Sequence, residues 1–251
     1  ICIELKSLSA GFRILVSIFA CLRDFIAGIG YRLIVLGIEI SVTPISTRHP
    51  TIEINRYRSE DYPDRVDAAL AKIESTPSGS YLLEGLKPLS ARGKKVVLNE
   101  SPSWNPAPSA DAVFTDQQRR RYGERESEGE AAVELGLITK GRFCKGEGTN
   151  ATVNWSPSVG LMVDSEGRPQ GYSAELADEA FVGLAHELIH AKHIMSGDFK
   201  HGGDRLDPKS KSGKEELRAT GLGKYASGRV SENTIRAENG LSMRKFYDGS
   251  R

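Results

Sequence analysis

The residues best suited to chemistry in this 251-residue chain are His186, Glu187 and His190, in the sequence His-Glu-Leu-Ile-His. On an α-helix, positions i and i+4 share one face, so both imidazoles can bind a single cation. Glu187 lies about 100° further around the helix axis, near that cation without pointing at it. This placement suits a general base that takes a proton from water in zinc-dependent hydrolysis. The spacing therefore predicts His186 and His190 as zinc ligands and Glu187 as a catalytic carboxylate.

A catalytic zinc site needs a third protein ligand and an open position for water. The extended pattern HExxHxxGxxH is absent, because its glycine position holds His193. His193 lies on a different helical face, so we interpret it as a surface residue or one that supports the ligands from outside. His201 and Asp204, in a glycine-rich loop, remain possible ligands. Glu215 and Glu216 on the next predicted helix are better candidates, although two solvated glutamates at a helix N-terminus are an equally good interpretation.

These residues need a helix at 174–195, which begins after the N-cap candidate Ser173 and ends before Gly197. Other helices are predicted at 61–75, around 214–221, and over 231–247 with an interruption at Gly240. Strands are predicted at 51–57, 94–100, 151–155 and 159–164, whereas closely spaced prolines exclude regular structure from 101–111. The order predicts an α+β fold: a compact zincin-like domain whose small mixed sheet packs on the active-site helix, with C-terminal helices.

The composition is that of an ordinary globular protein, with 39% apolar and 27% charged residues. A net charge of +1 gives no strong field for nucleic acid or an anionic membrane. Cys2, Cys21 and Cys144 are too few and too far apart for a disulfide framework or a cysteine zinc site. Residues 12–40 are apolar, but charged residues divide them into runs shorter than the roughly 20 residues of a spanning helix. We therefore expect no nucleic-acid partner, no stable membrane insertion and a monomer.

Two further segments carry a resemblance. KEELRATGL (214–222) together with HELIH (186–190) is similar to the zinc site of the clostridial neurotoxin light chains. That resemblance implies Glu216 as the third ligand. It also implies that Arg244 and Tyr247, an Arg-x-x-Tyr pair, stabilise the oxyanion of the tetrahedral intermediate. Without the resemblance, Arg244 and Tyr247 are only an i, i+3 pair on a terminal helix.

Four blocks over residues 130–247 resemble a family of type III secreted effector zinc metallopeptidases, which includes the NleD-like effectors of enteric bacteria. The blocks are GEGTNATVNW, HELIHAKH, EELRATGLG and SENTIRAENGLSMRKFY. TPISTRHPTIEIN also resembles the start of a Xanthomonas member. The resemblance implies secretion by a type III system and cleavage of a host protein in the host-cell cytoplasm. In the enteric branch the targets are mitogen-activated protein kinases, so a signalling kinase is one candidate substrate.

The chain begins with Ile1, and its composition changes sharply near Val42. We interpret residues 1–41 as a non-native or disordered upstream extension and residues 42–60 as a disordered secretion segment. Residues 61–251 then form the zinc metallopeptidase domain.

A different class of function remains open: a zinc-stabilised effector that binds a host protein without turnover. It requires a closed four-ligand site in which His201 or Asp204 occupies the water position. Glu187 argues against this class, because a structural zinc site has no use for a base. A metalloenzyme acting on a non-peptide amide is a third hypothesis. For the peptidase, we expect ATVNW (151–155) to border the cleft, and Glu232 and Asn233 to orient the site from outside.

Overall fold

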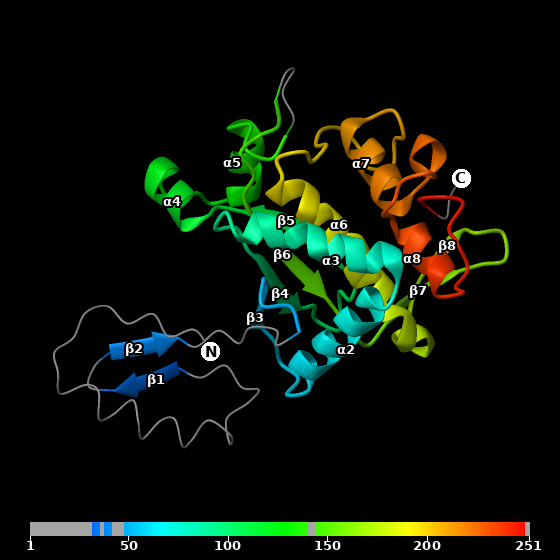
Figure 1. Ribbon diagram of the computed structural model, residues 1–251, viewed down its shortest axis with the longest axis horizontal. Helices are drawn as coiled ribbons and strands as arrows, with labels where there is room; N and C mark the ends of the chain where they lie inside the picture. The colour runs from blue at the N-terminus through cyan, green and yellow to red at the C-terminus, as the bar shows by residue number, and fades with distance from the viewer. Residues whose placement is uncertain (1–31, 36–37, 42–47, 140–143, 249–251) are drawn as a thin grey trace.

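The computed structural model describes residues 32–35, 38–41, 48–139 and 144–248. Its largest sheet has four strands in the order β3-β4-β6-β5 (Figure 1). The strands are β3 (Ile52–Arg56), β4 (Val96–Glu100), β5 (Ser109–Val113) and β6 (Asn150–Trp155). The first two run parallel to each other and to β6, whereas β5 runs antiparallel to β6. In this sheet β3 and β5 are therefore the edges.

The alternation of buried and partly buried residues along β6 explains how the sheet packs against the helices. Along β6, every second residue is buried, ending with Trp155. Side chains of one strand alternate between the two faces, so these residues share one face. The Trp155 indole donates a 2.9 Å hydrogen bond to the carbonyl of Ala180, the first residue of α6 (Ala180–Met195). The strand pattern thus fixes the sheet directly against the helix that carries HELIH.

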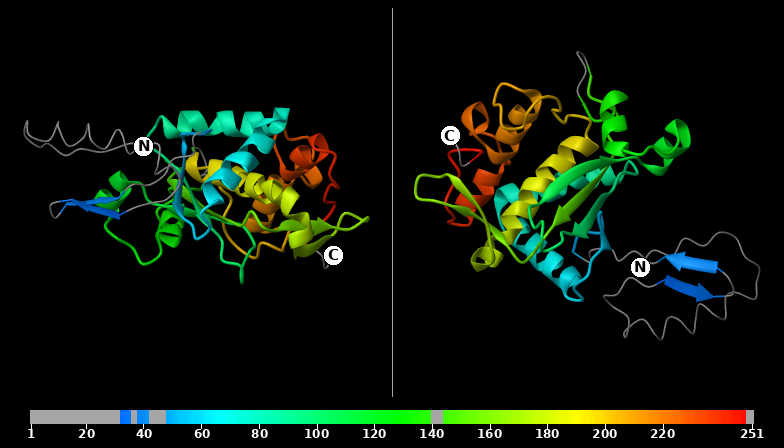
Figure 2. Two further views of the ribbon diagram at one scale, coloured as in Figure 1. Left: turned by 90° about the horizontal axis from the view of Figure 1, so that it is seen from below. Right: turned by 180° about the vertical axis from the view of Figure 1, so that it is seen from behind.

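Helix α6 is central in the molecule. It contacts β5 and β6 on one side and four helices on the others (Figures 1 and 2). Those helices are α2 (Tyr62–Glu74), α3 (Pro77–Ser90), α7 (Lys211–Thr220) and α8 (Glu232–Glu238). Thirteen residues of α6 are buried, including His186, Glu187 and His190. Polar groups in such a helix need compensation, which the neighbouring helices must supply.

The remaining elements lie around this core. Two short helices, α4 (Asp116–Tyr122) and α5 (Glu128–Glu134), follow β5. A hairpin of β7 (Gly160–Val163) and β8 (Pro169–Ser173) leads into a 3₁₀ helix, η2 (Ala174–Glu179), that precedes α6. A second 3₁₀ helix, η3 (Gly223–Tyr225), follows α7. Separately, β1 (Arg32–Val35) and β2 (Ile38–Ser41) pair as an antiparallel hairpin.

The predicted α+β fold is confirmed, with a small mixed sheet on the HELIH helix and helices at the C-terminal end. The strand predicted at 51–57 is confirmed, although it lies in the segment assigned above to disorder: residues 52–56 form β3, and its Ile52 and Ile54 are buried in the core. One segment that was predicted to be irregular is a strand instead. Residues 109–113 form β5, because the strand begins directly after the last of the three prolines, Pro108.

The predicted terminal helix is shorter than expected. Helix α8 begins after the Ser231 cap and ends at Glu238, and residues 241–248 contain no helix. Gly240 has a φ of 69°, a left-handed conformation that glycine adopts without strain and that ends the helix. Arg244 and Tyr247 therefore lie on an irregular segment and not on one helical face.

Most of the N-terminal predictions fall on residues 1–31, 36–37 and 42–47, outside the described residues. The interpretation of 1–41 as an upstream extension stays a prediction. Among the residues that the structure describes, no helix is long and apolar enough to cross a membrane.

Candidate metal centre and active site

The two HELIH histidines point at the same place. Their rings lie edge to face with centroids 4.7 Å apart. The Nε2 atoms of His186 and His190 are 3.0 Å apart, and both residues are buried. The sequence spacing thus produces the expected pair of imidazole donors on one face of α6.

The third donor arrives from α7. This helix begins at a Ser210 cap, whose hydroxyl accepts from the Gly213 amide, and ends at Gly221 in a left-handed conformation. Between these ends, Glu216 faces α6. Its Oε2 lies 3.3 Å from His186 Nε2 and 3.2 Å from His190 Nε2. These three side chains, of which the histidines are buried and Glu216 is partly buried, form a group that could hold a metal ion.

Carboxylates on the outer side of both rings decide which nitrogens face the centre. Glu232 Oε2 lies 2.9 Å from His186 Nδ1, and Glu215 Oε1 lies 3.4 Å from His190 Nδ1. A carboxylate accepts a hydrogen bond from an imidazole Nδ1–H, and this tautomer leaves the Nε2 lone pair directed at the centre. Two imidazole lone pairs and a carboxylate oxygen then converge, and a cation satisfies all three. The donor set therefore fits a metal ion.

Without a metal, protons serve as the counter-charge. Burial disfavours protonation of His186, but hydrogen bonds to Glu216 and Glu232 outweigh it and raise the pKa of His186 to about 9. Burial likewise opposes protonation of His190, yet Glu215 and Glu216 raise its pKa well above the ordinary value. Conversely, burial would raise the pKa of Glu216, but hydrogen bonds from both histidines hold it far below its usual range. A metal ion and protons therefore compete for this site.

Glu187 differs from the other carboxylates. It is 7% exposed, and its side chain has no hydrogen bond within the described part of the chain. Burial raises the pKa of Glu187; His186 and His190 lower it, while Glu216 and Asp111 raise it again. A buried carboxylate with a raised pKa and free oxygens beside the triad has the properties of a general base.

Arg244 lies behind His186. Its Nη1 donates to Glu232 Oε2 at 2.8 Å, its Nε donates to the Phe246 carbonyl, and its Nη2 donates to the Tyr247 carbonyl. Each of the three nitrogens has one acceptor, and the two Nη atoms each carry a further N–H, so contact of Arg244 with an oxyanion stays a prediction. The guanidinium also holds Glu232, and thereby His186, in place. Arg236 adds a second 2.8 Å hydrogen bond to Glu232.

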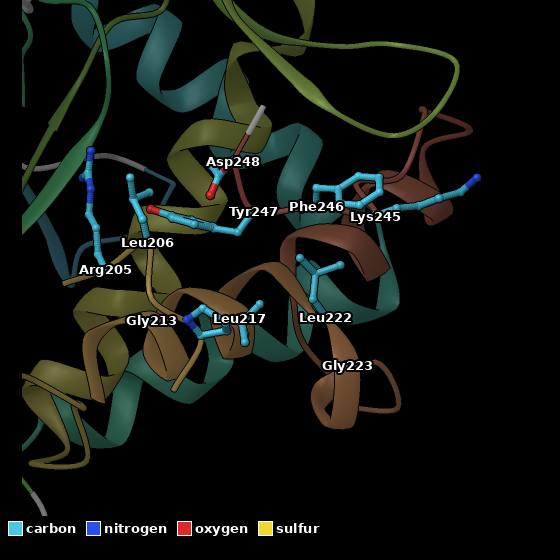
Figure 3. A pocket seen from close by; sticks show the side chains of 11 residues that line it. Arg205, Leu206, Gly213, Leu217, Leu222, Gly223, Lys245, Phe246, Tyr247 and Asp248 are labelled. Carbon is cyan, nitrogen blue, oxygen red and sulfur yellow. The ribbon is translucent and has the colours of Figure 1, made fainter. Parts of the chain in front are cut away.

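Tyr247 remains beside the triad. The neighbouring charge of Glu216, added to burial, raises the pKa of the Tyr247 phenol, and the two side chains are hydrogen-bonded. The ring also forms a wall of an apolar cavity of about 250 Å³, to which Leu206, Leu217 and Leu222 contribute (Figure 3). We call this cavity the side pocket. In Figure 3 the Tyr247 hydroxyl points toward Leu206.

Two residues near the centre were not found from the sequence. Tyr172 is the penultimate residue of β8 in the β7–β8 hairpin, and burial, followed by the charges of Glu187 and Glu232, raises the pKa of its phenol. Asp111 lies on the edge strand β5, within residues 101–111, for which the closely spaced prolines predict no regular structure. The only available signal for Tyr172 was its position next to the predicted cap Ser173.

The other candidates fall outside the triad. His193 Nδ1 contacts Glu215, so it supports the carboxylate beside His190, as its helical position indicated. His201 and Asp204 belong to no group of potential metal ligands among the described residues. The closed four-ligand site required by a purely structural zinc is thus not supported. The expected cleft strand is also corrected: β6 is flanked by β4 and β5, so it cannot pair with a further strand, and the edges of this sheet are β3 and β5.

Comparison with known families gives one match, to the Peptidase M91 family described as effector protein, and it covers residues 50–247. No curated protein matches the chain. The matched region contains β3, the whole sheet, α6, α7, α8 and the segment that carries Arg244 and Tyr247. By its sequence over these elements, the chain belongs to the Peptidase M91 family of effector proteins.

Proposed function

We propose that this effector is a zinc-dependent endopeptidase that cleaves a host protein inside the host cell. The observation that carries the proposal is the convergence of His186, His190 and Glu216 beside the unpaired carboxylate of Glu187. The effector family supports the peptidase class and implies secretion into host cells. The identity of the host protein lies beyond these observations, and the signalling kinase remains a candidate only.

Zinc fits this donor set best. Two imidazole nitrogens and one carboxylate oxygen form a common set of ligands for catalytic zinc, which leaves one position for water. When bound, zinc acts as a Lewis acid that acidifies water and polarises the scissile carbonyl. The outer carboxylates Glu232 and Glu215 keep both rings in the orientation that this requires.

The chain's own residues supply the proton transfers. Glu187 takes a proton from the attacking water, whose oxygen bonds to the carbonyl carbon. Glu187 then passes the proton to the amide nitrogen as the carbon–nitrogen bond breaks, and an amine leaves. Its raised pKa suits a group that must accept and return a proton near neutral pH. Tyr247 and Tyr172, whose phenols are influenced by the charges of Glu216 and Glu187 respectively, are assigned to the oxyanion as hydroxyl donors.

Two surfaces are available to a peptide substrate. The edge strand β5 carries Asp111 close enough to affect Glu187, so a peptide extended along β5 passes the base. Backbone hydrogen bonds to such an edge are independent of the peptide's sequence. The side pocket, which shares the Tyr247 ring with the centre, then selects an apolar side chain of the substrate. Its volume of about 250 Å³ is below that of most small-molecule sites and suits one side chain.

The test compares wild type with Glu187→Gln, each loaded with zinc, on a host-cell lysate whose new protein termini are identified by mass spectrometry. Wild type should generate new termini, and Glu187→Gln should reduce their rate of appearance by about 10²- to 10⁴-fold. Zinc content should stay unchanged in that variant and fall in His186→Ala. Glu175→Gln, at an exposed glutamate of η2 that lies 12 residues before Glu187, serves as the matched control. Normal cleavage by Glu187→Gln would show that the assignment is wrong.

A further inference from the structure

A second cavity lies on the other side of α6. It has a volume of about 330 Å³, and its walls include Tyr81 of α3, Lys192 and His193 of α6, and Arg218 of α7. Lys224 and Tyr225 also line this cavity, which we call the back pocket. Lys192 is two residues after His190, which turns it about 160° away from the metal-facing side of the helix.

The back pocket concentrates positive charge. Lys192, Arg218 and Lys224 line it, and no carboxylate is among its lining residues. Arg229 adds a fourth cation, with its guanidinium 3.8 Å from the centre of the Tyr81 ring. The Lys192 amine approaches the same ring at 5.0 Å. The whole chain has a net charge of only +1, so this grouping is local.

Most of these cations lack a counter-charge. Arg218 pairs with Asp198 at 3.1 Å and approaches Glu215 at 3.6 Å. Neither Lys192 nor Lys224 forms an ion pair with a carboxylate anywhere in the described ranges. Lys192 is half-buried, so its charge is partly withdrawn from water. Unpaired like charges held together at a partly buried site favour binding of an anion.

We propose that the back pocket binds the phosphoryl group of a small phosphorylated molecule. A phosphate monoester carries nearly two negative charges and three acceptor oxygens, which matches two unpaired lysines and the neighbouring Arg218. A volume of about 330 Å³ lies at the lower end of small-molecule sites, so the pocket suits a sugar phosphate or a lipid headgroup.

The test measures binding of fructose 1,6-bisphosphate to the zinc-loaded full chain by calorimetry, with fructose as the blank. Lys192→Gln and Lys224→Gln should each weaken binding by roughly tenfold, as expected for one lost charge-assisted hydrogen bond. Arg120→Gln removes an equal charge from an exposed position on α4 and should leave the affinity unchanged. Circular dichroism and zinc content confirm that each variant is folded.

A second arm identifies the source of the phosphoryl group. Vesicles of phosphatidylcholine with a phosphoinositide are compared with vesicles that carry the same charge as phosphatidylserine. Sedimentation with the phosphoinositide vesicles alone, lost in Lys192→Gln, indicates a lipid headgroup, whereas binding of the sugar phosphate alone indicates a free metabolite. The proposal is overturned if neither probe binds, or if both lysine variants bind as wild type does. Neither experiment measures cleavage activity, so the result is independent of the proposed function.

Discussion

The two sides of α6 bear opposite charge and differ in how that charge is paired. On the metal side, His186 and His190 each meet carboxylates on both ring nitrogens. On the other side, Lys192 and Lys224 face a cavity without any carboxylate in its walls. One helix therefore separates a centre that needs a cation from the pocket for which we propose an anion.

The difference teaches that charge alone does not determine what a residue contributes to stability. A buried ion in a network loses its counter-charge when one partner is removed, which is strongly destabilising. Removing a cation that has no ionic partner leaves no opposite charge uncompensated. The comparison can be tested with four substitutions of decreasing expected effect, three of which remove a charge and one of which removes a hydroxyl.

The largest effect is expected for Glu232→Gln in metal-free protein. Glu232 is 2% exposed and contacts His186, Arg236 and Arg244 at 2.8–2.9 Å. Its loss leaves buried cations uncompensated, so the free energy of unfolding should fall by about 3–5 kcal/mol. Urea titration measures this. Glu134→Gln, at an exposed position on α5, should change it by less than about 0.5 kcal/mol.

The pH dependence of that difference follows from two pKa shifts. Despite burial, Arg244 and His186 hold the pKa of Glu232 far below its ordinary value of 4.5, so the stabilisation is complete above pH 4.5 and declines below it. The pKa of His186 is raised from 6.5 to about 9, so its share is complete below pH 6.5 and is lost as pH rises through 9. The difference between wild type and Glu232→Gln should thus be largest between these limits. A difference that grows above pH 9 would contradict the pairing.

Tyr247→Phe is expected to be next in size. Removing one hydroxyl that donates to the oxyanion typically lowers kcat by about 10²- to 10³-fold. The zinc content should stay unchanged, because Tyr247 contacts Glu216 and is not itself one of the three donors. Tyr172→Phe is the matched comparison on the β7–β8 hairpin. If neither variant lowers kcat, the oxyanion is stabilised by another group, and Arg244→Lys becomes the next variant to measure.

The residues of the metal site that lie close together in the sequence, on one helix, could be predicted from the sequence. His186, Glu187 and His190 occupy one helix, and the 3.6-residue period alone places them. Glu216 is on another helix, and periodicity could not distinguish it from Glu215. In the structure the two glutamates approach different ring nitrogens. Glu216 lies beside the Nε2 atoms of His186 and His190, whereas Glu215 lies beside the Nδ1 atom of His190.

The rest depends on contacts between distant segments. Arg244 is placed by Asn233, whose side-chain oxygen accepts from the Arg244 amide at 2.8 Å and whose amide donates to the Arg244 carbonyl at 2.7 Å. Gly167 of the β7–β8 turn accepts from Lys245 at 2.8 Å. No local pattern in residues 241–248 encodes these bonds. The same holds for Tyr172, which reaches the centre only because the hairpin folds beside α6.

Glu215→Gln tests whether a carboxylate outside the group of three donors supports zinc binding. Glu215 supports His190 and His193 at once, and its Oε2 accepts from the Lys200 amide at 3.2 Å. Loss of such an outer carboxylate typically weakens metal binding by about 10- to 100-fold. Competition with a chelator measures the zinc affinity. Glu216→Gln should weaken it further, and equal losses in the two variants would remove the distinction between ligand and support.

The smallest effect, and the one of opposite sign, is expected for Lys192→Gln. Because burial and the charges of Arg218 and Lys145 lower the pKa of Lys192, its protonated form is less favourable in the folded state than in the unfolded state. Removing that charge should raise the free energy of unfolding at neutral pH by up to about 0.5 kcal/mol. The gain should vanish as pH rises toward the ordinary lysine value of 10.5, where both states lose the proton. Urea titrations of both proteins at pH 7 and pH 10 measure it, and a loss of stability at pH 7 would show that the Tyr81 contact outweighs the repulsion.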